Sequence, residues 1–177
     1  MKRIFRYLKE TLNYGFWYPR CFEFYLCDFS DANFGSGRID RKSTSGTCHF
    51  LENCLVSWFS KKQNVISLSA AEAQYVAAAV CCAQLLWMKS TLNDFGLVYD
   101  CVPIFCDNTS AINLTKNLIQ HSRTKHIDIK HHFIHDLVPK DEICVQYVCL
   151  KDQITDILTK TLPLDQFAFL RTKLGVL

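Results

Sequence analysis

The sequence predicts an α/β domain in which a five-stranded mixed sheet is flanked by helices. Three strand-like segments follow one another in the first third of the chain, as expected for an antiparallel meander. Beyond them, two further short strands alternate with helical segments, an order that packs helices against the faces of a sheet. The chain has 177 residues, of which 49% are hydrophobic. This is enough for one domain with a sizeable core.

The first half supplies three strands and a long helix. Residues 1–12 carry apolar side chains at three- and four-residue spacing, which predicts an amphipathic helix. Strands are expected over 22–30, 44–51 and 55–59. Ser69 and Glu72 then have the spacing of a capping box, which predicts a largely buried helix of about 25 residues ending near Gly96.

The second half alternates between the two kinds of element. After the long helix, the expected order is a strand over 103–106, helices over 107–116 and 126–138, a strand over 143–150, and helices over 152–162 and 166–174. Three aromatic residues in periodic apolar settings are expected in the core, namely Trp58, Trp87 and Phe133.

Charge and hydropathy exclude several classes of protein. The formal net charge is only +3, so any basic surface for nucleic acid must be local. The apolar stretches are too short and interrupted to span a bilayer, and we therefore expect no membrane partner. The basic amino end is amphipathic and lacks the apolar core of a secretion signal.

Ten cysteines raise the alternative of a disulfide framework. A chain of this size does not need one, and no CxxC pair supports a thiolate zinc site. We expect reduced thiols, of which several lie in apolar runs and should be buried: Cys48, Cys54, Cys81, Cys82, Cys144 and Cys149.

Acidic residues at strand ends are the candidates for chemistry. Asp31 ends the first expected strand, Asp107 follows the fourth, and Asp156 lies in the helix after the fifth. Carboxylates gathered from separate elements require cations, and hard oxygen ligands suit Mg²⁺ or Mn²⁺. Such a cluster would serve a two-metal phosphodiesterase. Considered alone, Asp107 is more often a turn or helix cap, so spacing by itself leaves both interpretations open.

Several longer sequence motifs carry a resemblance to a known family. They are Ser30-Asp-Ala32, Asp40-Arg-Lys-Ser-Thr-Ser-Gly46, Ser57-Trp-Phe-Ser-Lys-Lys-Gln63, Cys106-Asp-Asn108, Ser110-Ala-Ile112, His121-Ser-Arg-Thr-Lys-His-Ile-Asp128, His132-Phe-Ile134 and Thr155-Asp-Ile-Leu-Thr-Lys160. In this order they resemble the ribonuclease H domain of copia-type retrotransposon Pol polyproteins. The resemblance covers essentially the whole chain and implies a ribonuclease H-like fold.

The resemblance implies metal-dependent cleavage of the RNA strand of RNA–DNA hybrids during reverse transcription. Two Mg²⁺ ions, which Mn²⁺ can replace, would be held by Asp31, Asp107, Asp156 and a glutamate. The family's Ala-Glu-Tyr word here has Gln74 in its centre, which offers a carbonyl oxygen but no charge. Gln74 should therefore weaken the binding of the metal ions. Glu72 lies about 200° away around the helix and should point elsewhere.

Two functions therefore stay open for this chain. One is a ribonuclease H impaired by Gln74, and the other is a catalytically inactive remnant that only binds nucleic acid. Asp28 and Asn33 also depart from the family, which usually has glycine and aspartate there, without removing a ligand. Together with a start that resembles the interior of the reverse transcriptase, the departures suggest a truncated or partly decayed element copy, with a partial gene model as the alternative.

The resemblance also divides the chain and names its partners. Residues 1–20 resemble the end of the reverse transcriptase, 21–162 form the ribonuclease H-like domain, and 163–177 form a helical tail. The expected partners are an RNA–DNA hybrid and the reverse transcriptase portion of the parent polyprotein, with no small-molecule cofactor. The expected location is the cytoplasm, in a virus-like particle, with the nucleus as the alternative.

Basic residues in loops or at element ends are candidates for contacts with the phosphates of a hybrid duplex. They are Arg38, Arg41, Lys42, Lys61, Lys62, Arg123 and Lys125. A solvated rim is the alternative interpretation. A third function, a zinc-binding module, would use His131 and His135 with His126 or His132. A solvent-facing or hybrid-facing histidine helix is the simpler interpretation of that segment.

Overall fold

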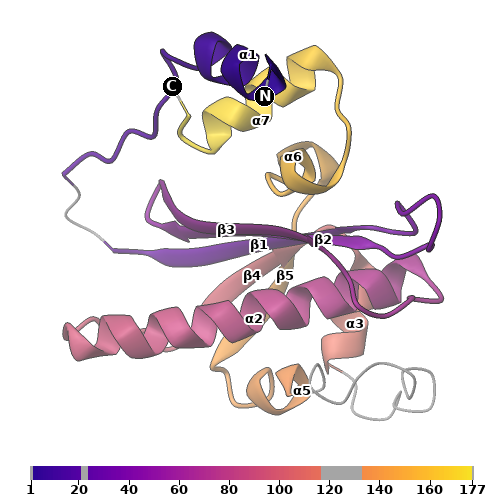
Figure 1. The fold of residues 1–177 in the computed structure, drawn as a ribbon. Coiled ribbons are helices and arrows are strands. Elements are labelled where there is room, and N and C mark those ends of the chain that lie inside the picture. The colour runs from indigo at the N-terminus through magenta and orange to yellow at the C-terminus, as the bar shows by residue number, and fades with distance from the viewer. Residues whose placement is uncertain (1, 21–23, 117–132, 177) are drawn as a thin grey trace.

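The computed structural model, which describes residues 2–20, 24–116 and 133–176, centres on one five-stranded sheet (Figure 1). The strand order is β3-β2-β1-β4-β5. The strands are β1 (Leu26–Asn33), β2 (Thr44–Leu51), β3 (Cys54–Lys62), β4 (Val102–Cys106) and β5 (Ile143–Tyr147). The first three are antiparallel neighbours, whereas β4 pairs parallel with both β1 and β5. The predicted mixed sheet and fold class are confirmed.

Helices cover both faces of the sheet. They are α1 (Lys2–Glu10), α2 (Ala70–Asp94), α3 (Thr109–Lys116), α5 (Ile134–Leu137), α6 (Asp156–Thr159) and α7 (Leu164–Lys173), with a 3₁₀ turn η3 (Leu150–Asp152). In Figure 1, α2, α3 and α5 lie on one face, and α6, α7 and α1 lie on the other. The larger core cluster lies under α2, where Tyr75 and Leu85 pack with Ile104 of β4.

The long helix α2 begins at the predicted capping box. The Ser69 hydroxyl accepts from the Glu72 amide at 3.2 Å, and the Glu72 carboxylate accepts from the Leu68 amide at 2.6 Å. These bonds satisfy amides that the first helical turn leaves without backbone partners. By length and composition α2 could cross a membrane, but half of its most apolar window is buried inside the domain. It is therefore better explained as the core helix.

Several element boundaries differ from the prediction. In the described part of the chain, β1 begins at Leu26 and extends to Asn33, and β3 continues to Lys62 because its whole length pairs with β2. The strand β5 ends at Tyr147 rather than at residue 150.

The prediction of a single helix over 152–162 is wrong. This stretch contains only the last residue of η3 and the four-residue helix α6. Between them, the buried Gln153 side chain donates to the Ser30 carbonyl of β1 at 3.1 Å. This side-chain bond to the sheet holds the backbone away from a continuous helix. Of the helix expected over 126–138, residues 126–132 lie outside the described residues.

The prediction that Trp58 and Trp87 belong to the core is also wrong. Their exposed fractions are 51% and 63%. On β3, Trp58 lies on the α6 and α7 side of the sheet, where its ring centroid is 5.2 Å from that of Phe16. Phe133, by contrast, is partly buried and packs against the main core.

The cysteines follow the burial prediction in part. Cys48, Cys54, Cys81 and Cys82 are buried, whereas two others, Cys144 and Cys149, are only half-buried. Every cysteine in the described ranges is free.

The two ends of the chain meet on the α6 side of the sheet. Phe16 forms a bridge with Val176, and the Tyr18 hydroxyl donates to the Leu55 carbonyl at 2.8 Å. The Arg171 guanidinium lies 4.4 Å from the centre of the Tyr14 ring. Helix α1 itself buries no residue, so its apolar side is exposed.

Candidate active site

Three aspartates from three elements converge at one end of the sheet. Asp31 belongs to β1, Asp107 directly follows β4, and Asp156 begins α6. One carboxylate oxygen from each lies within 4.8 Å of the others. Because β1 and β4 are parallel neighbours, their carboxyl ends lie side by side, which brings Asp31 and Asp107 together. Asp31 and Asp156 are buried, and Asp107 is partly buried.

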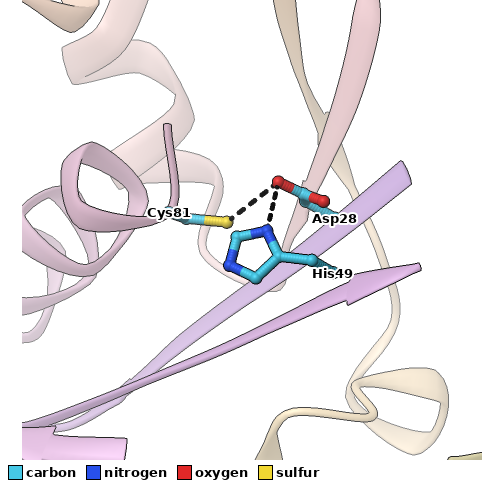
Figure 2. Close-up of side chains that lie close together, drawn as sticks. All are labelled: Asp28, His49 and Cys81. Atoms are coloured by element: carbon cyan, nitrogen blue, oxygen red, sulfur yellow. Dashed lines mark hydrogen bonds and ion pairs between the residues drawn. The ribbon is translucent and has the colours of Figure 1, made fainter. Parts of the chain in front are cut away.

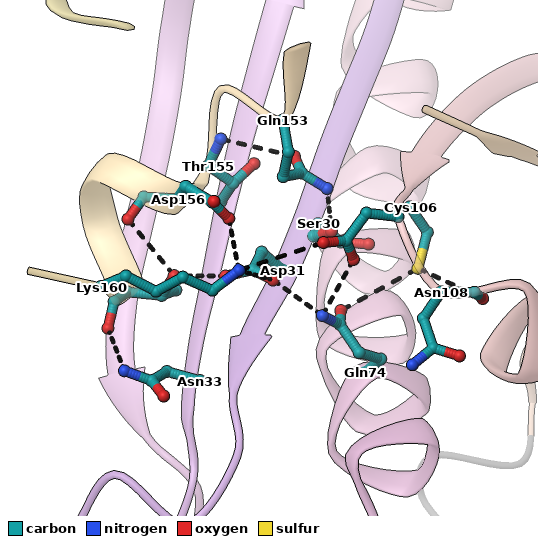
Figure 3. Close-up of polar contacts among 12 residues, drawn as sticks. Ser30, Asp31, Asn33, Gln74, Cys106, Asn108, Gln153, Thr155, Asp156 and Lys160 are labelled. Carbon is teal, nitrogen blue, oxygen red and sulfur yellow. Dashed lines mark hydrogen bonds and ion pairs between the residues drawn. The ribbon is translucent and has the colours of Figure 1, made fainter. Parts of the chain in front are cut away.

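Gln74 of α2 completes this group, as the sequence predicted, but it acts as a donor. Its amide Nε2 donates to Asp31 Oδ1 at 2.7 Å (Figure 3). It also donates to Asp107 Oδ1 at 3.1 Å. The residue is buried. A neutral amide therefore joins two of the three aspartates at the position where the family resemblance places a glutamate, the fourth carboxylate.

Lys160 lies between all three aspartates and was missed as a site residue by the sequence reasoning. Its Nζ is 2.7 Å from Asp156 Oδ1, 3.3 Å from Asp31 Oδ1 and 4.0 Å from Asp107 Oδ2. The available signal was the four-residue spacing between Asp156 and Lys160, which places them on one helix face. The positive charge partly neutralises the cluster.

Thr159 and Asn33 fix the position of α6 relative to β1. The Thr159 hydroxyl donates to Asp31 Oδ2. The Asn33 amide in turn donates to the Thr159 carbonyl at 2.9 Å. Asn33, which departs from the family pattern, therefore has a structural contact at the site.

Burial and like charge raise the pKa values of two of the aspartates, Asp107 and Asp156. Burial and then the Asp31 charge raise the pKa of Asp107. Burial, only partly offset by the Lys160 hydrogen bond, raises the pKa of Asp156 to about 6. Burial acts to lower the pKa of Lys160, but the Asp156 hydrogen bond and the Asp31 charge outweigh it and raise that pKa. The cluster therefore favours bound protons or cations.

Gly46 permits α6 to lie directly on β2. A Cβ atom at this position would meet Thr159 Cγ2 at 2.6 Å and Thr155 Cγ2 at 3.0 Å. The absence of a side chain at Gly46 thus lets the backbone approach closely enough to place Asp156 beside Asp31.

Glu72 lies outside the cluster, as predicted from its helical position. Its Oε2 accepts the Leu68 amide at the start of α2. It therefore serves the helix terminus and does not replace the missing glutamate.

Of the predicted phosphate-binding residues, five belong to the described part of the chain. Arg38, Arg41 and Lys42 lie in the loop after β1, and Lys61 and Lys62 end β3. This is the Asp31 end of the sheet, because β2 begins at Thr44 opposite both Asn33 and Lys62. Lys62 also pairs with Asp40 at 3.1 Å, which partly neutralises it. Arg123 and Lys125 lie outside the described residues.

Of the four histidines named for a zinc-binding helix, His135 belongs to the described residues. His126, His131 and His132 lie outside the described residues. His135 is buried, with its ring 5.4 Å from that of Tyr75. The expectation of a solvent-facing or hybrid-facing position is therefore wrong for this residue.

Comparison with known proteins finds relatives of one kind that match almost the whole sequence. The chain is 37% identical over 177 residues to the "Retrovirus-related Pol polyprotein from transposon RE1" of Arabidopsis thaliana, covering 99% of this chain and 12% of that protein. It is 33% identical over 180 residues to the polyprotein from transposon TNT 1-94 of Nicotiana tabacum, covering 99% of this chain and 13% of that protein. The chain thus spans about an eighth of the length of these curated relatives. No family model matches the sequence.

A solved structure supports the fold independently. The N-terminal ribonuclease H domain of a Mycobacterium tuberculosis protein, solved as a fusion with maltose-binding protein, matches with a TM-score of 0.52 and 9% identity. The match covers 85% of this chain and 98% of the other. The chain belongs to the copia-type retrotransposon Pol polyproteins, of which it is one segment with a ribonuclease H-like structure.

Proposed function

We propose that this segment is a metal-dependent endoribonuclease that cleaves the RNA strand of RNA–DNA hybrids, with an activity reduced by Gln74. The observation that carries the proposal is the convergence of Asp31, Asp107 and Asp156 in a ribonuclease H-like fold. Three carboxylates from separate elements have no evident structural purpose at one site, since their mutual repulsion opposes burial.

The donor set fits divalent magnesium. All three residues offer hard carboxylate oxygens, and burial already raises the pKa of Asp107 and Asp156, so positive charge there is favourable. When bound, two Mg²⁺ ions would activate the attacking water and stabilise charge on the leaving oxygen, and Mn²⁺ could replace them. Asp31, Asp107 and Asp156 would hold the ions, and the two oxygens of Asp31 now accept hydrogen bonds from Gln74 and Thr159.

Gln74 is expected to impair this site in two ways. Its carbonyl oxygen can serve as a ligand but brings no negative charge. In addition, its Nε2 donates to both Asp31 and Asp107, so the side chain must break these bonds and turn before it can serve as a ligand. Both effects weaken ion binding.

Lys160 and the basic loop would hold the substrate. The Lys160 side chain reaches the carboxylates from α6 and, when cations take its place, can turn towards a phosphate of the bound strand. Arg38, Arg41, Lys42 and Lys61 lie at the same end of the sheet, where they can follow a duplex backbone. Hybrid recognition would then depend on shape and on ribose 2′-hydroxyls.

The proposal also implies a partner, a substrate and a location for the reaction. The partner would be the reverse transcriptase portion of the parent polyprotein, and the substrate would be the template RNA that this portion has copied. Residues 1–20 would be the end of that portion, and residues 163–177 a helical tail to the domain. The reaction would take place in a cytoplasmic particle, with the nucleus as the alternative.

The test is cleavage of an end-labelled RNA–DNA hybrid with Mg²⁺ and with Mn²⁺. We expect weak cleavage by the unaltered chain, stronger cleavage by Gln74→Glu, and none by Asp107→Asn. The double-stranded DNA of the same sequence is the substrate control. Cleavage that persists at full rate in Asp107→Asn would overturn the proposal.

A specific observation favours a second candidate, a remnant that binds nucleic acid without cutting it. Gln74 and Lys160 together donate to all three aspartates, so the cluster is partly neutralised by the chain itself. This candidate predicts salt-sensitive binding of hybrids but no cleavage by the unaltered chain under either metal. Recovery of activity in Gln74→Glu would then show that only this position was lost.

A further inference from the structure

A second polar cluster lies buried between the sheet and α2, away from the aspartates described above. It comprises Asp28 of β1, His49 of β2 and Cys81 of α2 (Figure 2). Asp28 Oδ2 is 2.8 Å from His49 Nδ1 and 3.6 Å from Cys81 Sγ. All three residues are essentially inaccessible to solvent. Each of the three elements thus contributes one side chain with a donor atom that metals prefer.

One oxygen of this cluster has no hydrogen-bond partner. Asp28 Oδ1 is buried and is unpaired among the described residues. An unsatisfied carboxylate oxygen in the interior is costly, since charged oxygens need compensation more than neutral ones do. Burial raises the pKa of Asp28, although the bond from His49 opposes this. The imidazole therefore compensates only one of the two oxygens.

We propose that Asp28, His49 and Cys81 form a structural Zn²⁺ site. Cys81 Sγ, His49 Nδ1 and the Asp28 carboxylate supply three side-chain ligands, and the unpaired Asp28 Oδ1 can provide the fourth donor atom if the carboxylate binds through both oxygens. Charge also balances, because one divalent cation, one carboxylate, one thiolate and a neutral imidazole sum to zero. A neutral complex is the form that a buried site tolerates best.

The present distances are close to those that zinc requires. With bonds of about 2.0 Å to nitrogen or oxygen and about 2.3 Å to sulfur, near-tetrahedral geometry separates the donor atoms of different residues by about 3.3 to 3.5 Å. The Sγ to Oδ2 distance of 3.6 Å already fits, and the Nδ1 to Oδ2 distance of 2.8 Å must widen by about half an ångström. The other ring nitrogen, His49 Nε2, lies 3.1 Å from the Thr47 hydroxyl, a contact that orients the ring.

The site is separate from the aspartate cluster in position and in chemistry. Cys81 lies seven residues beyond Gln74, which is about 10 Å along α2. Its thiolate and imidazole donors favour zinc, whereas the all-oxygen cluster favours magnesium. Because the three residues are inaccessible, zinc would enter as the chain folds, and Cys81 would release its proton on binding. The ion would then join β1, β2 and α2.

The experiment refolds the chain with Zn²⁺ or with Co²⁺, removes loosely held metal with a weak chelator, and measures metal content and absorption. We expect about one Zn²⁺ per chain, and for Co²⁺ a thiolate-to-cobalt charge-transfer band in the near ultraviolet. Zinc should also raise the midpoint of thermal unfolding, since the assembled site binds it more tightly than the unfolded chain does. None of these readouts depends on hybrid cleavage, so they are independent of the proposed nuclease activity.

Cys82→Ala is the matched control for Cys81→Ala. Cys82 is the adjacent residue and is equally buried, but it is not part of the group formed by Asp28, His49 and Cys81. The cobalt band should persist in Cys82→Ala and disappear in Cys81→Ala. Absence of the band and of bound zinc in the unaltered chain, which needs no variant to fold, would overturn the proposal and leave Asp28 and His49 as a hydrogen-bonded pair. A band that survives Cys81→Ala would overturn it equally.

Discussion

Lys160 Nζ lies 2.7 Å from Asp156 Oδ1, and this ion pair places a positive charge within 4.0 Å of all three clustered aspartates. The two residues are four apart and extend from the same short turn. The lysine therefore competes for the position that a divalent ion would take. Its contribution can be separated from that of the aspartates by measuring stability with and without Mg²⁺.

Replacing Lys160 with methionine should destabilise the ion-free chain and strengthen its response to magnesium. The change removes the positive charge that compensates the buried carboxylates. We expect it to lower the free energy of unfolding by about 1–3 kcal/mol, which is less than for a fully buried pair because the lysine side chain is 30% exposed. Added Mg²⁺ should raise the unfolding midpoint more in Lys160→Met than in the unaltered chain. Lys151→Met, an exposed lysine of η3, is the control. An equal magnesium shift in all three proteins would contradict competition.

Asp156 should make stability fall as the pH rises from about 4 to about 6. Its unfolded pKa is about 3.9, and in the folded chain burial raises the pKa to about 6, so the folded state binds more protons in this window. The stability contribution is complete below the unfolded pKa and is lost as the pH passes the folded one. The total is about 2–3 kcal/mol.

Urea unfolding in chelator at several pH values measures this contribution as the difference between the unaltered chain and Asp156→Asn. The asparagine variant should become relatively more stable above pH about 6. Asp165→Asn, which removes an exposed carboxyl group of α7, controls for the loss of one acidic residue. A pH-independent difference for Asp156→Asn would show that burial does not shift this group.

Local patterns in the sequence predict much of the fold, and the sequence motifs shared with the family predict most residues of the aspartate cluster. The capping box at Ser69 predicts the start of α2 because it depends on neighbours in sequence. The convergence of Asp31 and Asp107 follows from two adjacent parallel strands. In contrast, the contact between His49 and Asp28 depends on the register of β1 against β2, which no local pattern contains.

The exposure of Trp58 shows a related limit. Alternation along a strand distinguishes two faces, but it does not say which part of a face the helices cover. The elements on that face cover Trp58 only in part, and its ring centroid lies 5.2 Å from that of Phe16. Lys160 was overlooked for a similar reason, since its role depends on where the short helix α6 lies over β2.

Gly46→Ala should disturb the site by displacing α6. The added methyl group would meet Thr159 Cγ2 at 2.6 Å and Thr155 Cγ2 at 3.0 Å, so the helix that carries Asp156 must move. We expect a loss of about 1–3 kcal/mol in the free energy of unfolding and at least a tenfold loss of hybrid cleavage in a Gln74→Glu background. Gly15→Ala, where the new Cβ has no atom within 4 Å, is the control. Full cleavage in Gly46→Ala would mean that α6 can shift without cost to the site.

Arg41 and Lys61 should contribute to hybrid affinity through phosphates alone. Both are exposed at the Asp31 end of the sheet, and neither forms an ion pair within the described residues, unlike Lys62, which pairs with Asp40. Arg41→Ala and Lys61→Ala should each weaken binding in chelator and lower the slope of log affinity against log salt by about 1, equally for hybrids of different sequence. Lys140→Ala, an exposed residue after α5, should leave the slope unchanged. If the Lys140 variant lost as much affinity as the other two, binding would reflect general charge, and the duplex path along the loop after β1 would have to be abandoned.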